Sequence, residues 1–302
     1  MKAWVLHGIN DMKFEDVPEP VPEDGEVLIQ VKAAGICASD IQRVFVSGAY
    51  HYPIILGHEF SGVTADGRRV GVYPLIPCLS CGPCRSGHYE TCSNYGYVGS
   101  RRDGAFAEYA ATPERNLLAL PDEVSFEQAA VFEPAAVALH AVKKVTLRGV
   151  AKAAVIGNGA IGQLIGAWLR HYGVSYVEVL GRGDSGSFAN YDVCFEAAGS
   201  SGAFRRCAEL VRPNGEIVLV GNPAADFSMD RKLYWQVLRK QITLRGSWNS
   251  AYPADWQRVL EHAGTLCLDS FISHKYEFPE LGSAIEMMRA KREKYSKVMV
   301  ML

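Results

Sequence analysis

The chain lacks any excess of charge of one sign. Its 302 residues contain 31 lysines and arginines against 33 aspartates and glutamates, a formal net charge of −2. This balance excludes a protein that coats nucleic acid or an acidic membrane surface through a broad field of one sign. With 48% apolar and 21% charged residues the composition is that of a folded globular chain. The length predicts about two domains.

Long hydrophobic runs are also missing. The most apolar stretch, residues 153–169, contains Asn158, Gln163 and several glycines, and is shorter than the ~20 residues of a transmembrane helix. Residues 1–10 lack the basic region and apolar core of a signal peptide. The chain has no internal repeat or low-complexity tract. We therefore expect a cytoplasmic enzyme.

The spacing of apolar residues changes along the chain. Short strand patterns such as 27–31 and 69–72 occupy the first third, and a helical pattern over 125–145 is interrupted by Pro134. Beyond residue 151 strand and helix patterns alternate, which predicts a parallel α/β sheet. The expected strands are 153–156, 176–180, 193–196, 217–220, 242–245 and 297–302, and the expected helices are 159–172, 202–210 and 280–291.

Four of the eight cysteines are clustered in a C-x2-C-x2-C-x7-C pattern. They are Cys78, Cys81, Cys84 and Cys92. In a reducing compartment such clustering favours a metal site over disulfides. Four thiolates close a tetrahedral zinc shell and leave no position for water, so the pattern predicts a structural zinc ion. The alternatives are a [4Fe–4S] cluster and free thiols that lie together by coincidence.

A glycine-rich turn follows the apolar strand 153–156 and opens a helix. That context is the one a dinucleotide-binding loop requires. The first glycine would allow the tight turn, the second the approach of a pyrophosphate, and the third close helix–strand packing. The predicted cofactor loop consists of Gly157, Asn158, Gly159, Ala160, Ile161 and Gly162.

The second strand of this sheet should end in an acidic residue that binds the ribose hydroxyls of NAD. Instead it ends in Gly181 and Arg182. Because an arginine at this position can pair with a 2′-phosphate, the sequence favours NADP over NAD. Asp184 is close enough in sequence to keep NAD open.

A second set of potential ligands is dispersed along the chain. Its members are Cys37, His58, Glu59 and Glu133. Singly, each is typical of a core or a surface position. Together, a cysteine, a histidine and a carboxylate would form an open zinc site with room for water or substrate, the pattern of catalytic zinc.

Seven segments in the same order carry a resemblance to a known family. The chain resembles the zinc-dependent medium-chain dehydrogenases, most closely their polyol branch. The segments are GICASD (35–40), HYPIILGHEFSG (51–62), PLIPCLSCGPC (74–84), VGSRRDGAFAEY (98–109), FEPAAVALHA (132–141), GNGAIG (157–162) and LRGSW (244–248).

The resemblance implies a role for each site residue. Cys37, His58 and Glu133 match the catalytic zinc ligands, and Glu59 matches a neighbouring carboxylate that binds zinc directly or through water. The clustered cysteines match the structural zinc lobe. Asp40 matches the partner that holds the imidazole of His58, and Ser39 matches the hydroxyl that takes the alcohol proton. Gln42 stands where relatives often continue the proton relay with a histidine.

The resemblance also implies the architecture. We expect an α/β protein with a β-rich, GroES-like catalytic domain (1–146 and 268–302) and a Rossmann-type, doubly wound parallel sheet (147–267). The expected assembly is a homodimer or homotetramer.

The sheet should, however, be truncated. Only residues 181–191 join two of its strands, whereas a complete half of such a sheet has a helix, a strand and a helix there. We therefore expect a reduced adenine pocket.

The substrate is less closely defined. The cations Arg43, His51, Arg101, Arg102 and Lys275 lie in segments that line the cleft of relatives and could hold a phosphate or an anionic sugar. Trp248 is a candidate wall of the pocket. The expected substrate is a small polyol or sugar alcohol, with or without a phosphate. The alternatives are a broad secondary-alcohol dehydrogenase and a non-catalytic, zinc-containing nucleotide-binding scaffold.

Overall fold

The computed structural model describes residues 1–302, which form two compact units. Unit 1 comprises residues 1–133 and 251–302, and unit 2 comprises residues 134–250. Both boundaries come earlier in the chain than those expected from the sequence. Trp168 of unit 2 donates a hydrogen bond to the carbonyl of Ala135 (3.0 Å), so this stretch packs within unit 2. Tyr252 stacks on Tyr73 with centroids 4.6 Å apart, which places it within unit 1.

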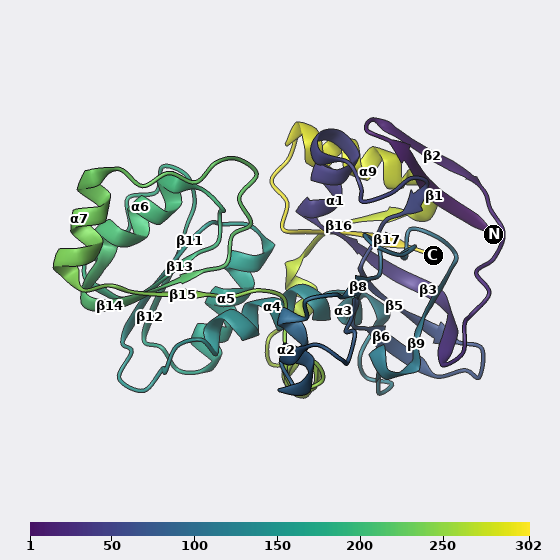
Figure 1. Ribbon diagram of the computed structural model, residues 1–302, viewed down its shortest axis with the longest axis horizontal. Helices are drawn as coiled ribbons and strands as arrows, with labels where there is room; N and C mark the ends of the chain where they lie inside the picture. Colours follow the sequence, from purple (N-terminus) through teal and green to yellow (C-terminus); the bar gives the residue numbers. More distant parts are fainter. The chain divides into compact units, whose positions relative to one another are not determined.

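Unit 1 is built on a seven-stranded sheet whose strands come from both ends of the chain (Figure 1). Most neighbours are antiparallel, and only the C-terminal pair is parallel. The order is β10 (Leu117–Ala119), β6 (Arg69–Val72), β5 (Glu59–Thr64), β3 (Glu26–Ile36), β17 (Lys297–Met301) and β16 (Ile272–Glu277), with β9 (Tyr109–Pro113) also paired to β3.

Smaller elements of unit 1 surround this sheet. One sheet contains β2 (Asp11–Asp16), β1 (Lys2–Gly8) and β4 (Ile54–Ile55), and another contains β7 (Leu75–Ile76) and β8 (Gly96–Tyr97). The helices are α1 (Ala38–Gln42), α2 (Gly82–Arg85), α3 (Phe126–Ala130), α8 (Ala254–His262) and α9 (Leu281–Ala290). Helix α9 contributes Leu281, Ala284 and Ile285 to the apolar core beneath β3 and β5.

The helical pattern over 125–145 is broken, but not at Pro134. Helix α3 begins with a capping box, in which Ser125 and Gln128 bond each other's backbone N–H groups. It ends at Ala130, and α4 (Phe132–Val142) begins two residues later. Pro134 therefore lies in the first turn of α4, where a backbone N–H has no intrahelical acceptor and proline is tolerated.

Unit 2 is a parallel five-stranded sheet with helices on both faces (Figure 1). Its order is β12 (Tyr176–Leu180), β11 (Lys152–Ile156), β13 (Tyr191–Glu196), β14 (Val211–Leu219) and β15 (Thr243–Gly246). Helix α5 (Ala160–His171) covers one face, and α6 (Ser201–Leu210) and α7 (Arg231–Lys240) cover the other. Ala203, Phe204 and Leu233 of that second face pack on Ile156 and Cys194.

The strand order confirms the predicted truncation. A complete doubly wound sheet has the order 3-2-1-4-5-6. The order β12-β11-β13-β14-β15 corresponds to 2-1-4-5-6, so the strand that would flank β12 is missing. Residues 181–190 form bends and turns in its place. No helix of either unit is long and apolar enough to cross a membrane.

Candidate functional site

Strand pairing in unit 1 brings three of the predicted catalytic ligands together. Cys37 follows β3 directly, and His58 immediately precedes β5, which is paired with β3 so that Gly35 lies opposite Glu59. The thiol of Cys37, the imidazole of His58 and the carboxylate of Glu59 all lie within 4.8 Å of one another. A thiol, an imidazole and a carboxylate are the donors that zinc prefers, so the group fits that ion.

Asp40 holds this group from within α1. One of its carboxylate oxygens accepts the backbone N–H of Cys37 (2.9 Å), and the other lies 3.5 Å from Nδ1 of His58. Burial by itself would lower the pKa of His58, but Asp40 and Cys37 raise it well above its usual value. A metal ion that binds this imidazole must displace a proton.

Glu133 lies outside that tight group. Its buried carboxylate accepts a hydrogen bond from the Tyr97 hydroxyl (3.2 Å), and the Tyr97 ring meets the His58 ring edge-on at 5.7 Å. Burial raises the pKa of Glu133 to about 7. The negative charge of Glu59 adds to this rise, whereas His58 opposes it. Glu133 is thus a second carboxylate beside His58, connected to it through Tyr97.

Lys297 is a site residue that sequence reasoning missed. Its ammonium group donates to both carboxylate oxygens of Glu59 (2.7 and 2.6 Å), and both side chains are buried. Burial alone would lower the pKa of Lys297, but the Glu59 carboxylate raises it. Gly35 makes room for the pair, because a Cβ there would lie 2.4 Å from a Glu59 oxygen. A lysine at the start of a C-terminal strand gives no sequence signal of this contact.

The cysteine cluster is assembled as the sequence predicts. The four thiols of Cys78, Cys81, Cys84 and Cys92 lie within 4.8 Å of one another. The sulfur atoms of Cys81 and Cys92 are 3.8 Å apart, and those of Cys78 and Cys84 are 4.0 Å apart. Hydrogen bonds from Ser80 lower the pKa of Cys78 to about 5. This shell has no further donor and fits a structural zinc ion.

The candidate substrate cations of unit 1 fall into two groups. Arg102 is paired with Glu26 (2.6 Å) and Lys275 with Glu127 (3.0 Å). Arg43 and Arg101 have aromatic rings as partners instead. His51 is exposed and lines a cavity with Arg101 and Arg102. In unit 2 Trp248, which follows β15, is 48% exposed.

The glycine loop of unit 2 has the shape of a phosphate cradle. Gly157 adopts a φ of +131°, and a Cβ at Gly162 would lie 1.8 Å from the Gly157 carbonyl oxygen. In contrast, a Cβ at Gly159 would meet no protein atom within 4 Å. Gly159 is also the N-cap of α5, and no side chain caps that helix. The space and the free N–H groups at this helix N-terminus fit a pyrophosphate.

The tip of β12 brings a carboxylate and two arginines near one turn. Asp184 accepts the backbone N–H of Gly181 (2.7 Å), while Arg182 is exposed. Arg206 of α6, which sequence reasoning missed, donates to the Gly181 carbonyl (3.2 Å), and its other terminal nitrogen is buried without a hydrogen-bond partner. The tip therefore offers donors for a phosphate as well as an acceptor for ribose hydroxyls.

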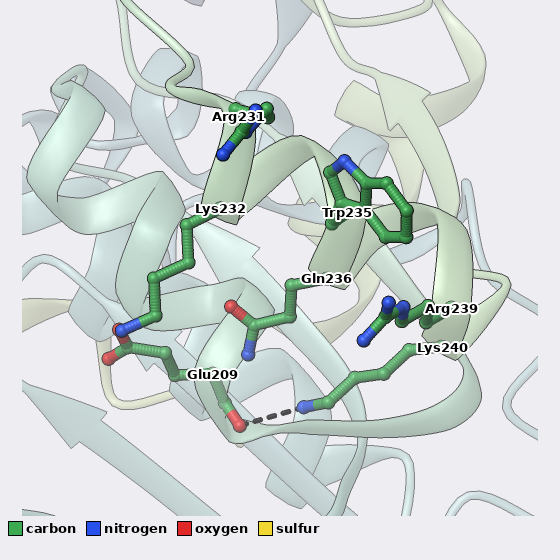
Figure 2. A pocket seen from close by; sticks show the side chains of 7 residues that line it. All are labelled: Glu209, Arg231, Lys232, Trp235, Gln236, Arg239 and Lys240. Carbon is green, nitrogen blue, oxygen red and sulfur yellow. Dashed lines mark hydrogen bonds between the residues drawn. The ribbon is translucent and has the colours of Figure 1, made fainter.

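A broad cavity beside α7 of unit 2 is not part of either site. It is lined by residues of α7 and by Glu209 (Figure 2). Lys240 donates to the carbonyls of Ala208, Glu209 and Val211 at 2.7–2.9 Å, which satisfies the last turn of α6. Arg239 stacks on Trp235 at 4.4 Å. These contacts indicate that the cavity results from the way the ends of α6 and α7 pack together.

Comparisons with known proteins cover both units. Residues 23–122 match the alcohol dehydrogenase GroES-like domain, and residues 184–264 match the zinc-binding dehydrogenase family. The chain is 30% identical to the galactitol 1-phosphate 5-dehydrogenase of Escherichia coli K12, over 90% of this chain and 91% of that protein. It is 28% identical to an L-threonine 3-dehydrogenase of Rhizobium etli, over 92% of each.

A solved structure agrees with these matches. The crystal structure of galactitol-1-phosphate dehydrogenase from Escherichia coli superposes with a TM-score of 0.90 at 27% identity, and each chain is covered completely. The resemblance drawn from the motifs, including its polyol branch, is thereby confirmed.

Proposed function

Because this chain belongs to the zinc-binding alcohol dehydrogenases, which are NAD(P)-dependent enzymes, we propose that it oxidises a secondary hydroxyl of a polyol or sugar alcohol. The hydride would go to NADP. The observation that carries the proposal is the convergence of Cys37 and His58 with two buried carboxylates beside the hydroxyl-bearing helix α1. Glu59 lies within 4.8 Å of both, and Glu133 is next to His58 through Tyr97. A chain that only bound nucleotides would have no use for such a set.

In the proposed catalytic site, Cys37, His58 and Glu133 would hold the zinc ion. Both oxygens of Glu59 are engaged by Lys297, whereas Glu133 has a tyrosine hydroxyl and no cation as its direct partner. When bound, zinc would supply the Lewis acidity that lowers the pKa of the substrate hydroxyl. Asp40 keeps Cys37 and His58 in place through its two carboxylate oxygens.

Ser39 is the proposed proton acceptor. It is half-buried in α1, two residues after Cys37, and the exposed Gln42 lies one helical turn further along. Ser39 would take the proton of the substrate hydroxyl and pass it toward solvent. A bound nicotinamide would accept the hydride from the same carbon, so that a ketone is left.

We also propose that NADP is preferred over NAD. Arg182 and Arg206 supply two guanidinium groups at the tip of β12, which supports recognition of a 2′-phosphate. Asp184 is the group that would favour NAD. Substitution of both arginines by glutamine should lower the kcat/KM ratio of NADP to NAD, and an unchanged ratio would overturn this preference.

A homodimer or homotetramer is the proposed assembly. Strand β15 is an edge strand whose four residues are all exposed, and Leu244 within it is 41% exposed. An unpaired edge of this kind can pair with the same strand of a second copy. Sedimentation of the wild type and of Leu244→Lys would test this, because a lysine on the edge should favour the monomer.

Activity is tested by following absorbance at 340 nm with zinc-loaded protein, NADP or NAD, and a panel of hexitols, pentitols, their phosphates and simple secondary alcohols. We expect oxidation of polyols, and its loss together with one zinc ion per chain in Cys37→Ser. Glu133→Gln should lose that zinc more readily than Glu59→Gln. Absence of turnover across the whole panel would overturn the proposed function.

A further inference from the structure

Two arginines of unit 1 converge on one tyrosine ring without a carboxylate partner. The guanidinium carbon of Arg101 lies 4.4 Å from the centre of the Tyr50 ring, and that of Arg43 lies 5.2 Å from it. We call these three residues the Tyr50 cluster. Nε of Arg43 is buried and has no hydrogen-bond partner. A tyrosine ring attracts a guanidinium but does not neutralise it, so the cluster keeps two positive charges.

The neighbouring cations differ from this pair. Arg102 and Lys275 are each neutralised by a glutamate within 3.0 Å. An arginine that already holds a carboxylate gains little from binding a second anion. The unneutralised charge of this region is therefore concentrated on Arg43 and Arg101, at the Tyr50 ring.

The Tyr50 cluster is tied to the proposed catalytic site by two routes. Along α1, Arg43 follows Ser39 by four residues and keeps helical dihedral angles, so the two lie on the same face one turn apart.

The second route is a chain of ring contacts. Arg101 also stacks on Tyr95 at 4.6 Å, and Tyr95 meets Tyr97 at 6.2 Å. Tyr97 in turn contacts His58 and Glu133. Both routes connect the two arginines to the proposed catalytic residues through direct neighbours, along α1 and along the row of tyrosine rings.

We propose that Arg43 and Arg101 form an anion subsite for the phosphate of a phosphorylated polyol. The inference rests on the proposed function and narrows its substrate to a sugar-alcohol phosphate whose phosphate is remote from the oxidised carbon. Two planar guanidinium groups can share the three terminal oxygens of a phosphate, whereas one such group already satisfies a carboxylate. The Tyr50 ring holds both guanidinium groups in place before the ligand arrives.

The test compares galactitol 1-phosphate, galactitol and galactonate as substrates of the zinc-loaded protein. The variants are Arg43→Gln and Arg101→Gln, which remove the charge and keep a polar side chain. The control is Arg289→Gln, because Arg289 also stacks on an aromatic ring, Phe45 at 4.1 Å, but is paired with Glu286 outside the Tyr50 cluster.

We expect kcat/KM for the phosphate ester to exceed that for galactitol, and each cluster variant to lower the former by about 10- to 100-fold. Turnover of galactitol should change by no more than about threefold, since it makes no charge-assisted bond to the cluster. The control should leave both values unchanged. Calorimetric titration of galactitol 1-phosphate without nicotinamide should show the same loss of binding in the cluster variants.

Two outcomes would overturn the subsite while the proposed function stands. One is equal kcat/KM for the ester and for galactitol, or an equal loss for both in the variants. The other is a preference for galactonate over the ester, which would assign the pair to a carboxylate. Failure of the function itself is distinct, because then no sugar alcohol is oxidised by the wild type.

Discussion

At the scale of single residues, the unit 1 site contains one fully buried ion pair. Glu59 and Lys297 neutralise each other in the interior, next to Cys37 and His58. The removal of two charges from water is costly, and a buried pair is tolerated only when its geometry is good. The cost of breaking such a pair is larger, because an uncompensated charge is left behind.

The Glu59–Lys297 pair gives a stability prediction. Lys297→Met should destabilise unit 1 by about 3–5 kcal/mol, since Glu59 would remain buried without its partner. Urea denaturation of the zinc-loaded protein measures this. The double variant with Glu59→Gln should recover part of the loss.

A surface pair of the same length is the matched control. Lys2 and Asp16 are also 2.6 Å apart, but both are exposed. Lys2→Met should leave the urea midpoint nearly unchanged, because solvent screens the pair. If Lys297→Met and Lys2→Met lowered the free energy of unfolding equally, burial of the Glu59–Lys297 pair would not contribute to stability.

At the scale of elements, a few side chains join strands that lie far apart in sequence. Asp192, in β13, accepts the backbone N–H groups of Ala151 and Lys152 at 2.9 Å and the guanidinium of Arg212 at 2.7 Å. It thereby connects the starts of β11, β13 and β14. Burial by itself would raise the pKa of Asp192, but Arg212 and the two N–H groups lower it below its usual value.

The lowered pKa of Asp192 predicts an acid sensitivity of unit 2. A carboxyl with a lower pKa in the folded state stabilises that state above its unfolded pKa of about 3.9, and the contribution is lost as the pH falls through the folded value. Asp192→Asn should cost about 1–2 kcal/mol at pH 7, given its partial exposure, and this cost should shrink as the pH falls below about 3.9. Thermal unfolding from pH 7 to pH 2.5 measures both, and a constant difference between the proteins would contradict the assignment.

The cysteine lobe provides a second prediction for an element. Between Cys78 and Cys92 the chain forms only the four-residue helix α2 and a three-residue turn of helix. So few backbone bonds cannot hold the lobe without a metal. Cys81→Ala should lower the zinc content by one ion per chain and increase proteolysis within residues 78–92. Full zinc content in this variant would argue against the four-cysteine shell.

At the scale of the whole molecule, unit 2 is a dinucleotide-binding sheet without the strand beyond β12. The glycine loop proposed to hold the pyrophosphate, Gly157–Gly162, is present, while residues 181–190 replace the side that frames adenine in a complete sheet. The adenosine half of the cofactor should therefore contribute less to binding than the nicotinamide half.

A truncated cofactor tests this expectation. Reduced nicotinamide mononucleotide lacks the adenosine half, and we expect its KM to exceed that of NADPH by no more than about 100-fold, the equivalent of two or so hydrogen bonds to a charged group. A homologous dehydrogenase with a complete six-stranded sheet is the comparison and should show a larger ratio. An equally large ratio in this chain would mean that residues 181–190 form a full adenine pocket.

Much of the fold was predictable because local pattern and tertiary structure agree. Strand β12 has the predicted bounds, 176–180. The absence of the strand beyond β12 was predictable from the short connection between β12 and β13. Helices α7 and α8 were missed. Helix α7 has a single fully buried side chain, Leu233, so its pattern in sequence is weak.

The sequence by itself determined which chemistry the chain carries. Spacing alone predicted the cluster of four cysteine thiols and the tight glycine turn before α5, because both depend on contacts between residues close in the chain. Only the tertiary structure decided which charges remain free to act. Lys297 reaches Glu59 from the other end of the chain, and Glu26 and Glu127 neutralise Arg102 and Lys275. These ion pairs join segments that are far apart in the chain. Because they depend on strand register and burial, no local sequence pattern predicts them.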